Sequence, residues 1–579
     1  MKLELKIFLA ALKERRELDA ILPDLLSAMD YDVIAKPGIG VRQFGVDIAA
    51  VGNDEDGVRK LFVFVVKEGN LNRSNWDTGQ TAVRQSVQEV RDFYLRSCVP
   101  AEYGDLPAVI CMTVGGEVDQ SLGPVVAGFT QQNSTAAVSI VTWDGDRLAG
   151  LITRYMLREE LLPKTEQAHF RKALAMVDTP DVSIRYFRSL VDGMFAQPPA
   201  NVREFEKTIS RLNVCLQVLF TWARDENNLD APYQAGEYAM LRSWAAASGW
   251  TMGDVAGKRR ALNALTQLRG SVLGLFKAYV EKLAPVFLAN YALSANTRSL
   301  EYIDVNLRAF DVLGRTAVYG LWLFQELTET GDDEGARPDE LSAEILSVRD
   351  SLIALIGNNP VLMTPVLDRQ AIDIVLASMF LASQGASDAL KRWLPSMFTR
   401  IVFAYRSHDK YPIYKDNYRT LLQHPLARDD AYRKKMTDAS SLLPTLACWL
   451  AIIGAEETLE DFGDFAAKEL GHCNFQLWLP NAASETYFWT ATGATGGMTM
   501  TSLAITEDGL EPIGLVGREI EGHDEFGSVS AMRQGVPSLV LTSCRHFQIP
   551  VPPQFWIELY KAPAQSSTKE ADGNDQLEV

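Results

Sequence analysis

The sequence predicts a multidomain α+β protein with a mixed α/β sheet at the N-terminus, a large all-α middle and a small β-rich C-terminal domain. Apolar runs of strand length fill the first 150 residues, helical spacing dominates afterwards, and short strand-like segments return beyond Gly471. With about 150 residues per domain, the 579-residue chain has room for three or four domains. We expect domains at 1–150, 151–470 and 471–562, followed by a disordered polar tail at 563–579.

Charge and cysteine usage limit the classes of function. Lys and Arg total 56 against 74 Asp and Glu, which gives a net charge of -18. Such a chain does not attract nucleic acid by its overall field, so a contact needs a local basic groove, a metal ion or a partner subunit. The six scattered cysteines contain no CxxC pair and indicate reduced thiols in the cytoplasm. The longest apolar run, 442–454, is shorter than the roughly 20 residues of a membrane span, so we predict no membrane contact.

The first 150 residues read as an ordered series of elements. Apolar residues at helical spacing from Leu5 to Met29 predict an opening helix or helix pair, with a break or fresh start at Pro23. The segments that follow, divided by Gly, Pro and Asp, predict strands at 31–38, 46–52 and 60–67, a helix at 81–97, a strand at 106–116, a short helix at 123–131 and a strand at 138–145. Three sequential strands followed by a helical crossover predict a mixed sheet with helices on both faces.

The rest of the chain divides into a helical part and a strand-like part. Long amphipathic segments predict helices at 202–224, 258–293, 298–329, 341–357, 371–383 and 458–470. They share no fixed repeat, so a bundle or irregular array is expected. Aromatic and β-branched segments predict C-terminal strands at 473–480, 485–493, 498–505, 510–517 and 537–543.

One pair of residues in the sheet region indicates metal-dependent phosphate chemistry. Asp47 lies on the second predicted strand and Lys67 ends the third. A carboxylate can hold Mg²⁺, and an ammonium group can steady the charge of a phosphate or an attacking water. An isolated aspartate and lysine twenty residues apart would mean little, but here strands and helices flank them in order.

On these residues, the first 150 positions resemble the PD-(D/E)XK, or restriction-endonuclease-like, superfamily. The resemblance implies a nuclease sheet in which Asp47 binds Mg²⁺ and Lys67 is the motif lysine, both in a cleft at the sheet edge. The second acidic position of the motif, two residues before the lysine, is Val65 in this chain. The candidate replacements are Glu68, if the strand bends at Gly69, and Glu17 on the opening helix.

Several readings of this resemblance stay open. Lys36, Arg42 and Arg73 lie in loops beside the expected cleft and are candidates for binding nucleic acid, with DNA as the expected substrate. A nuclease domain fused to a large helical body looks like an effector of a bacterial anti-phage or restriction system, which implies a partner subunit or a homo-oligomer. The alternatives are a catalytically decayed nuclease fold that binds nucleic acid or protein, and a plain turn in which Asp47 and Lys67 have no chemical role.

Overall fold

The computed structural model describes residues 5–557, apart from 7–8, 11, 13–17, 36–43, 79–81, 157–162, 252–254, 298, 300, 331–336, 416, 427–428, 501–511 and 523–524. The chain packs as two compact units: unit 1 comprises 1–279 with 333–337, and unit 2 comprises 280–332 with 338–579. Within the described ranges, no helix has the length and apolar character needed to cross a bilayer. The tail expected at 563–579 lies outside the described residues.

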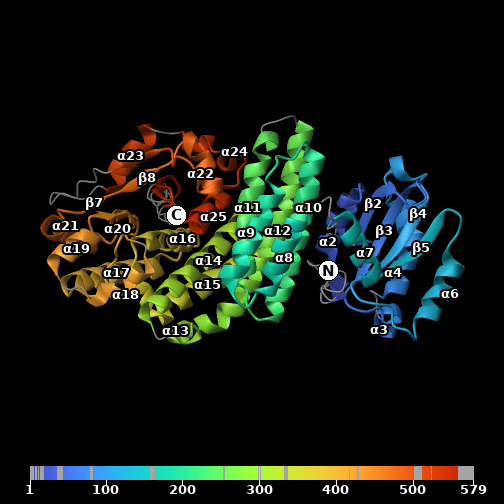
Figure 1. Cartoon of the computed structure of the whole chain (residues 1–579), viewed down its shortest axis with the longest axis horizontal. Helices are drawn as coiled ribbons and strands as arrows, with labels where there is room; N and C mark the ends of the chain where they lie inside the picture. Colours follow the sequence, from blue (N-terminus) through green and yellow to red (C-terminus); the bar gives the residue numbers. More distant parts are fainter. Residues whose placement is uncertain are drawn as a thin grey trace, which may run out of the picture. The chain divides into compact units, whose positions relative to one another are not determined.

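Unit 1 begins with a five-stranded sheet, drawn in blue and cyan in Figure 1. The strands lie in chain order and are β1 (Asp32–Ala35), β2 (Ile48–Asn53), β3 (Arg59–Lys67), β4 (Ala108–Val114) and β5 (Val138–Trp143). The first three strands pair antiparallel, and the last three pair parallel. The predicted order of strands and the mixed sheet are therefore confirmed.

Helices cover both faces of this sheet. On one face lie α2 (Asp19–Ala28) and α7 (Gly145–Tyr155), where the ring of Phe62 packs 4.8 Å from that of Tyr31. The opposite face carries the apolar core of the sheet, and its helices are α3 (Arg73–Asp77), α4 (Val83–Glu89), the π-helical turn η2 (Val90–Tyr94), α5 (Leu95–Ser97) and α6 (Gly123–Asn133). Buried valines on both sides explain why β3 reads as an unbroken apolar run.

The loop that precedes the edge strand β5 forms hydrogen bonds with its backbone. The hydroxyl of Thr135 accepts a hydrogen bond from Val138 N–H at 3.1 Å, and that of Ser134 accepts one from Ile140 N–H at 3.2 Å. The backbone N–H of Thr135 donates to the Val138 carbonyl at 2.7 Å. The loop thus pairs backbone groups that an added strand would otherwise use. The sequence from 120 to 143, which includes this loop and strand, contains no charged residue.

A group of long helices completes unit 1. They are α8 (Lys164–Ala175), α9 (Pro180–Met194), α10 (Val202–Asp225), α11 (Asp230–Thr251) and the part of α12 (Val255–Phe287) up to residue 279. Asp24 of α2 is only 3% exposed and accepts hydrogen bonds from Ser210 Oγ at 3.3 Å, Asn213 Nδ2 at 2.5 Å and Gln267 Nε2 at 2.5 Å. One buried carboxylate therefore fixes the first helix of the sheet domain to α10 and α12.

Unit 2 is mostly helical. Its helices are α13 (Ala292–Asn296), α14 (Tyr302–Glu329), α15 (Arg337–Asn358), α16 (Ala371–Ser383), α17 (Ser387–Arg406), α18 (Tyr418–Gln423), α19 (Asp430–Met436), α20 (Leu442–Ile452), α21 (Glu456–Glu469), α22 (Glu485–Thr490), α23 (Pro512–Gly522), α24 (Ser530–Arg533) and α25 (Pro537–Phe547). Its short strands are β6 (Ala439–Ser440), β7 (Asn474–Phe475), β8 (Leu477–Leu479) and β9 (Met498–Met500).

The prediction of a β-rich C-terminal domain is wrong for the described residues. The segments expected as strands at 485–493, 510–517 and 537–543 contain α22, α23 and α25. Every residue of α25 from Ser538 to Arg545 is buried. Its short apolar run Leu539–Leu541 cannot be told from a buried strand by periodicity alone. Pro537 at its first turn was the available helical signal.

The core of unit 2 contains an ionic cluster, formed by Asp311, Asp373, Arg308, Arg315 and Arg545. The guanidinium groups of Arg315 and Arg545 each lie 3.0 Å from the Asp311 carboxylate, and that of Arg308 lies 3.2 Å away. Burial alone would raise the pKa of Asp311, but the three arginines together lower it to about 2.

Asp373, on α16, belongs to the same cluster, but its pKa is shifted in the opposite direction. It is 6% exposed, and its Oδ1 atom has no hydrogen-bond partner among the described residues. Burial outweighs the attraction of Arg545 and raises the pKa of this carboxyl to about 7. One buried cluster therefore shifts the pKa values of its two carboxyl groups in opposite directions.

Candidate functional site

Asp47 lies at the start of β2, against the end of β3. Its backbone N–H donates to the Phe64 carbonyl at 3.0 Å, and its Oδ2 atom accepts a hydrogen bond from Val66 N–H at 2.7 Å. The register pairs Ile48 with Phe64, which places Asp47 beside Val65 and Val66. The side chain thus takes the position of a backbone acceptor at the end of the ladder.

Gly45 allows the chain to enter β2 at this point. It has a φ of +80°, and a Cβ atom at this position would lie 2.5 Å from the Ser86 carbonyl oxygen. Any larger residue would be strained and would collide with the backbone of α4. This close approach of loop and helix fixes the backbone just ahead of Asp47.

Lys67 is the last residue of β3 and pairs with Val114 of β4. Alternation along the strand places it on the same face as Val65, two residues earlier. Glu68 follows and is exposed, and Gly69 then takes a left-handed φ of +61° as the strand ends. The bend that Glu68 would need to approach the cleft is therefore present, while its role as a metal ligand stays a prediction.

Val65 occupies the position expected for the second acidic ligand. It is 1% exposed and belongs to the apolar cluster that includes Trp76, Val87 and Met112. Its cross-strand neighbour on β4 is Met112. The place where the motif would supply a carboxylate is thus part of the hydrophobic core, so a second ligand would have to come from another position.

Of the remaining residues predicted from the sequence, the structure describes only some. Glu17, Lys36 and Arg42 lie outside the described residues. Arg73 is exposed at the first position of α3, directly after Asn72, whose side chain accepts a hydrogen bond from Asn75 N–H at 3.0 Å and caps the helix. The structure places Asp47, Lys67 and Glu68 at one end of β2 and β3.

Glu117 is a further acidic residue at this edge, which the sequence interpretation missed. It follows β4, and its backbone N–H donates to Asn70 Oδ1 at 2.9 Å, just beyond the end of β3. Its carboxylate lies 3.0 Å from Lys6 Nζ, and this hydrogen bond raises the pKa of Lys6. An acidic residue three positions after the end of a buried parallel strand was the available signal, because the carboxyl ends of parallel strands meet at one edge.

Asp47, Lys67, Glu68 and Glu117 together form what we call the sheet edge site. Because β2 runs antiparallel to β3, its beginning lies at the same edge as the ends of β3 and β4. Strands are spaced about 4.8 Å apart, so β2 and β4 are separated by roughly 10 Å with β3 between them. Among the described residues, no three His, Cys, Asp or Glu side chains form a group that could hold a metal ion.

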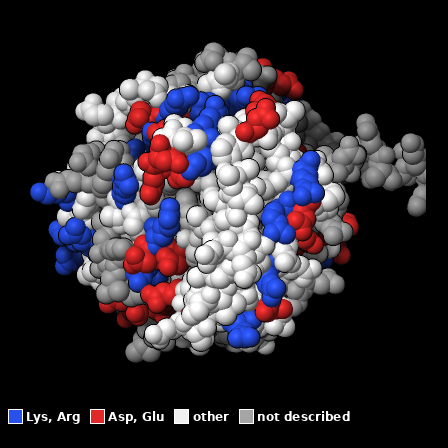
Figure 2. Space-filling model, turned by 90° about the vertical axis from the view of Figure 1, so that its right-hand side faces the viewer, with Lys and Arg blue, Asp and Glu red and all other residues white. Residues whose placement is uncertain are grey.

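Figure 2 shows the side of the molecule on which α6 and the sheet lie at the right of Figure 1. A broad uncharged band crosses this face, and the described Lys and Arg residues beside it are interspersed with Asp and Glu. The visible face therefore offers no continuous basic track along its described residues. A nucleic acid bound there would depend on a few individual cations or on a metal ion.

No family model, no curated protein and no solved structure matches this chain.

Proposed function

We propose that the sheet domain of unit 1 is a restriction-endonuclease-like nuclease that cleaves phosphodiester bonds with a divalent metal ion. The observation that carries the proposal is the β2–β3 register, which brings Asp47 and Lys67 to one edge of the sheet. In this proposal the protein acts in the cytoplasm as an effector of a bacterial anti-phage or restriction system, with a partner subunit or a second copy. DNA is the proposed substrate.

The residue types at this edge, carboxylates and a lysine, are those that a metal-dependent nuclease site uses. Carboxylate oxygens are the ligands that Mg²⁺ takes, and the bond from Val66 N–H orients the Asp47 carboxylate. Asp47 with Glu68 or Glu17 would hold the ion, which when bound polarises the phosphate and activates water. Lys67 would stabilise the negative charge that develops on the scissile phosphate. Glu117, beside Lys6, is an additional carboxylate available to this edge.

A second function, binding without cleavage, is favoured by one observation. Val65 is buried in the apolar core at the position where the motif would supply a ligand. A decayed nuclease domain would keep the sheet and its edge as a surface for nucleic acid or protein. Lys67 would then contribute to affinity through its charge and not to a reaction.

The test compares cleavage and binding by the full chain. Plasmid DNA, single-stranded DNA and RNA are incubated with Mg²⁺ or Mn²⁺ and with wild type, Asp47→Ala or Lys67→Ala. Lys60→Ala, on the same strand but paired with Asp54 at 2.6 Å, and Asp32→Ala, on exposed β1, serve as matched controls.

Cleavage that both site substitutions abolish and both controls keep supports the nuclease. Cleavage that survives Asp47→Ala and Lys67→Ala contradicts the site. Gel-shift binding that Lys67→Ala weakens, with no cleavage by wild type, supports the binding function instead.

A further inference from the structure

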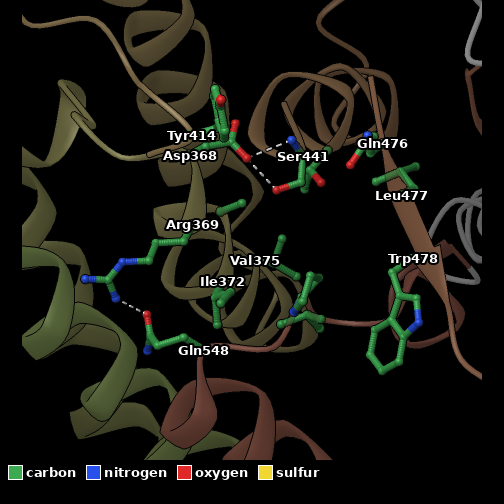
Figure 3. A pocket seen from close by; sticks show the side chains of 14 residues that line it. Asp368, Arg369, Ile372, Val375, Tyr414, Ser441, Gln476, Leu477, Trp478 and Gln548 are labelled. Atoms are coloured by element: carbon green, nitrogen blue, oxygen red, sulfur yellow. Dashed lines mark hydrogen bonds between the residues drawn. The ribbon is translucent and has the colours of Figure 1, made fainter. Parts of the chain in front are cut away.

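Two hollows of unit 2 differ in size and in what their walls already do. Figure 3 shows the smaller one, a cavity of about 120 Å³ in which the Asp368 carboxylate accepts hydrogen bonds from Ser441 N–H and Oγ, both at 2.7 Å. That carboxylate caps the first turn of α20 and so serves the fold. The larger one is an open groove of about 610 Å³ between α17 and α21, which has the size of a typical binding cleft.

The floor of this α17–α21 groove is aromatic. Phe398 of α17 and Phe465 of α21 are buried, and their ring centroids lie 6.2 Å apart in an edge-to-face contact. Phe403 also lines the groove, but 70% of its surface is exposed. Buried rings make the floor rigid, and covering an exposed phenylalanine beside them is favourable. The groove is therefore suited to apolar side chains of a partner.

Charged residues line the rim of the groove. Asp464 and Lys468 of α21 form a pair at 2.7 Å, and Arg406 of α17 pairs with Glu469 at 2.7 Å. Asp461, one turn ahead of Asp464, is exposed and forms no ion pair within the described ranges. A partner that brings a cation to this end of the groove meets a carboxylate that the chain leaves unpaired.

The chain itself carries an exposed apolar ridge on α18 and the turn that follows it. This α18 ridge consists of Tyr418, Leu422 and Leu426, all of them exposed, with 80% of the Leu426 surface in contact with solvent. Leu421 and His424, on the other side of the same segment, are buried and hold it against unit 2. The ridge is thus fixed in place, while its own apolar side chains are not used by the fold.

The groove and the ridge match in length and in charge. The groove follows residues 399–407 of α17, about 12 Å at 1.5 Å per residue, and the ridge covers the same number of residues, 418–426. Arg419 on the ridge is exposed and, like Asp461, has no ion pair among the described residues. Opposite charges matter here because two copies of a chain with a net charge of -18 otherwise repel each other.

We propose that the α17–α21 groove of one copy binds the α18 ridge of a second copy. Leu422 and Leu426 cover the aromatic floor, and Arg419 lies toward Asp461. Because the two surfaces differ, the contact is heterologous, and each pair of copies keeps one groove and one ridge for further copies. The contact is small, so we expect association in the micromolar range. It concerns unit 2 and does not depend on the nuclease chemistry proposed for unit 1.

The test is sedimentation velocity of the full chain at concentrations up to about 100 μM. Wild type should form species larger than a monomer, and Phe403→Asp in the groove or Leu426→Asp on the ridge should each abolish them. Both side chains are mostly exposed, so neither substitution alters the core. Leu288→Asp, at a leucine of unit 2 that is 72% exposed, is the matched control and should associate like wild type.

A mixture of the two variants distinguishes this contact from a symmetric one. The Phe403→Asp copy keeps its ridge and the Leu426→Asp copy keeps its groove, so the mixture should form dimers of one copy of each and nothing larger. Circular dichroism confirms that each variant is folded. Wild type that stays monomeric, single variants that associate like wild type, or a mixture that forms no dimers overturns the proposal.

Discussion

The sheet edge site of unit 1 and the ionic cluster of unit 2 use carboxylates in contrasting ways. At the sheet edge, Asp47 is half-buried and its bonded neighbour is the backbone N–H of Val66. In the cluster, Asp311 lies among three guanidinium groups within 3.2 Å. Three guanidinium groups lower the pKa of Asp311 to about 2 and tie this carboxylate into the core of unit 2. Asp47 lies at a sheet edge and not among arginines of the core, which is why the nuclease proposal rests on Asp47 and not on Asp311.

The largest expected effect on stability comes from removing one guanidinium group of the ionic cluster. Arg545→Met removes one partner of Asp311 and leaves the carboxylate undercompensated in the core. We expect a loss of about 3–5 kcal/mol in the free energy of unfolding, measured by urea denaturation. Lys468→Met breaks an exposed pair, 62% accessible on both sides, and should cost about 1 kcal/mol or less. Equal costs would show that the cluster is not structurally important.

The second effect depends on pH and concerns Asp373. Its pKa is raised from 3.8 to about 7, so the folded protein keeps a proton that the unfolded chain loses above pH 4. Stability therefore falls as pH rises from about 4 to 7, by as much as about 4 kcal/mol. Asp373→Asn should remove this penalty.

The measurement is thermal unfolding of wild type and Asp373→Asn across this range. The variant should be about 2–4 kcal/mol more stable at pH 8 and no different at pH 4. Asp350→Asn, whose side chain is 65% exposed beside Arg349, is the matched control and should show no such gap. A gap of the same size at pH 4 would mean that packing, and not ionisation, is responsible.

A third prediction asks whether the sheet edge site can hold a metal ion. Val65→Glu restores the carboxylate of the motif within an apolar cluster, and should destabilise the protein by roughly 2–3 kcal/mol without metal. If Asp47 and residue 65 share an ion, Mg²⁺ or Mn²⁺ should recover part of this loss in thermal unfolding. Val63→Glu lies on the same face, deeper in the sheet, and should show the loss without the recovery. Equal recovery in both variants would argue against a metal at Asp47.

The smallest expected effect distinguishes two contributions of Asp47 to stability, its hydrogen bond with Val66 N–H and its negative charge. Asp47→Asn keeps an oxygen that can accept the bond from Val66 N–H, whereas Asp47→Ala leaves that N–H unsatisfied. We expect a cost below about 1 kcal/mol for Asn and about 1–2 kcal/mol for Ala in urea unfolding. An Asn variant that unfolds as easily as the Ala variant would show that the negative charge itself supports the fold.

The sheet of unit 1 could be predicted strand by strand because each strand is a short apolar run closed by Gly, Pro or Asp. The long helices of the middle were also visible, since α10 and α14 keep a recognisable apolar stripe. The prediction failed at α25, because the short apolar run Leu539–Leu541 reads equally well as a buried strand. Local sequence does not reveal how completely neighbouring elements will cover a segment.

The positions of the candidate site residues were predictable only where strand order determined them. Asp47 and Lys67 follow from a hairpin, so a local register decides their proximity. The ionic cluster joins residues 234 positions apart, Asp311 and Arg545, and no local pattern reports such a contact. The cavity lined by Asp368, Ser441, Trp478 and Gln548 likewise brings together four distant segments of the chain, so no local pattern reports it.

The loop of Ser134 and Thr135 has a consequence for how this protein behaves in a crowded solution. Edge strands usually resist joining with other chains through charged residues or proline, but β5 has neither. Two hydroxyls and one amide of its own loop occupy the positions where a foreign strand would attach. Protection from fibril-like association thus depends on a few hydrogen bonds of one tight turn, and its loss would make a well-folded domain prone to aggregate.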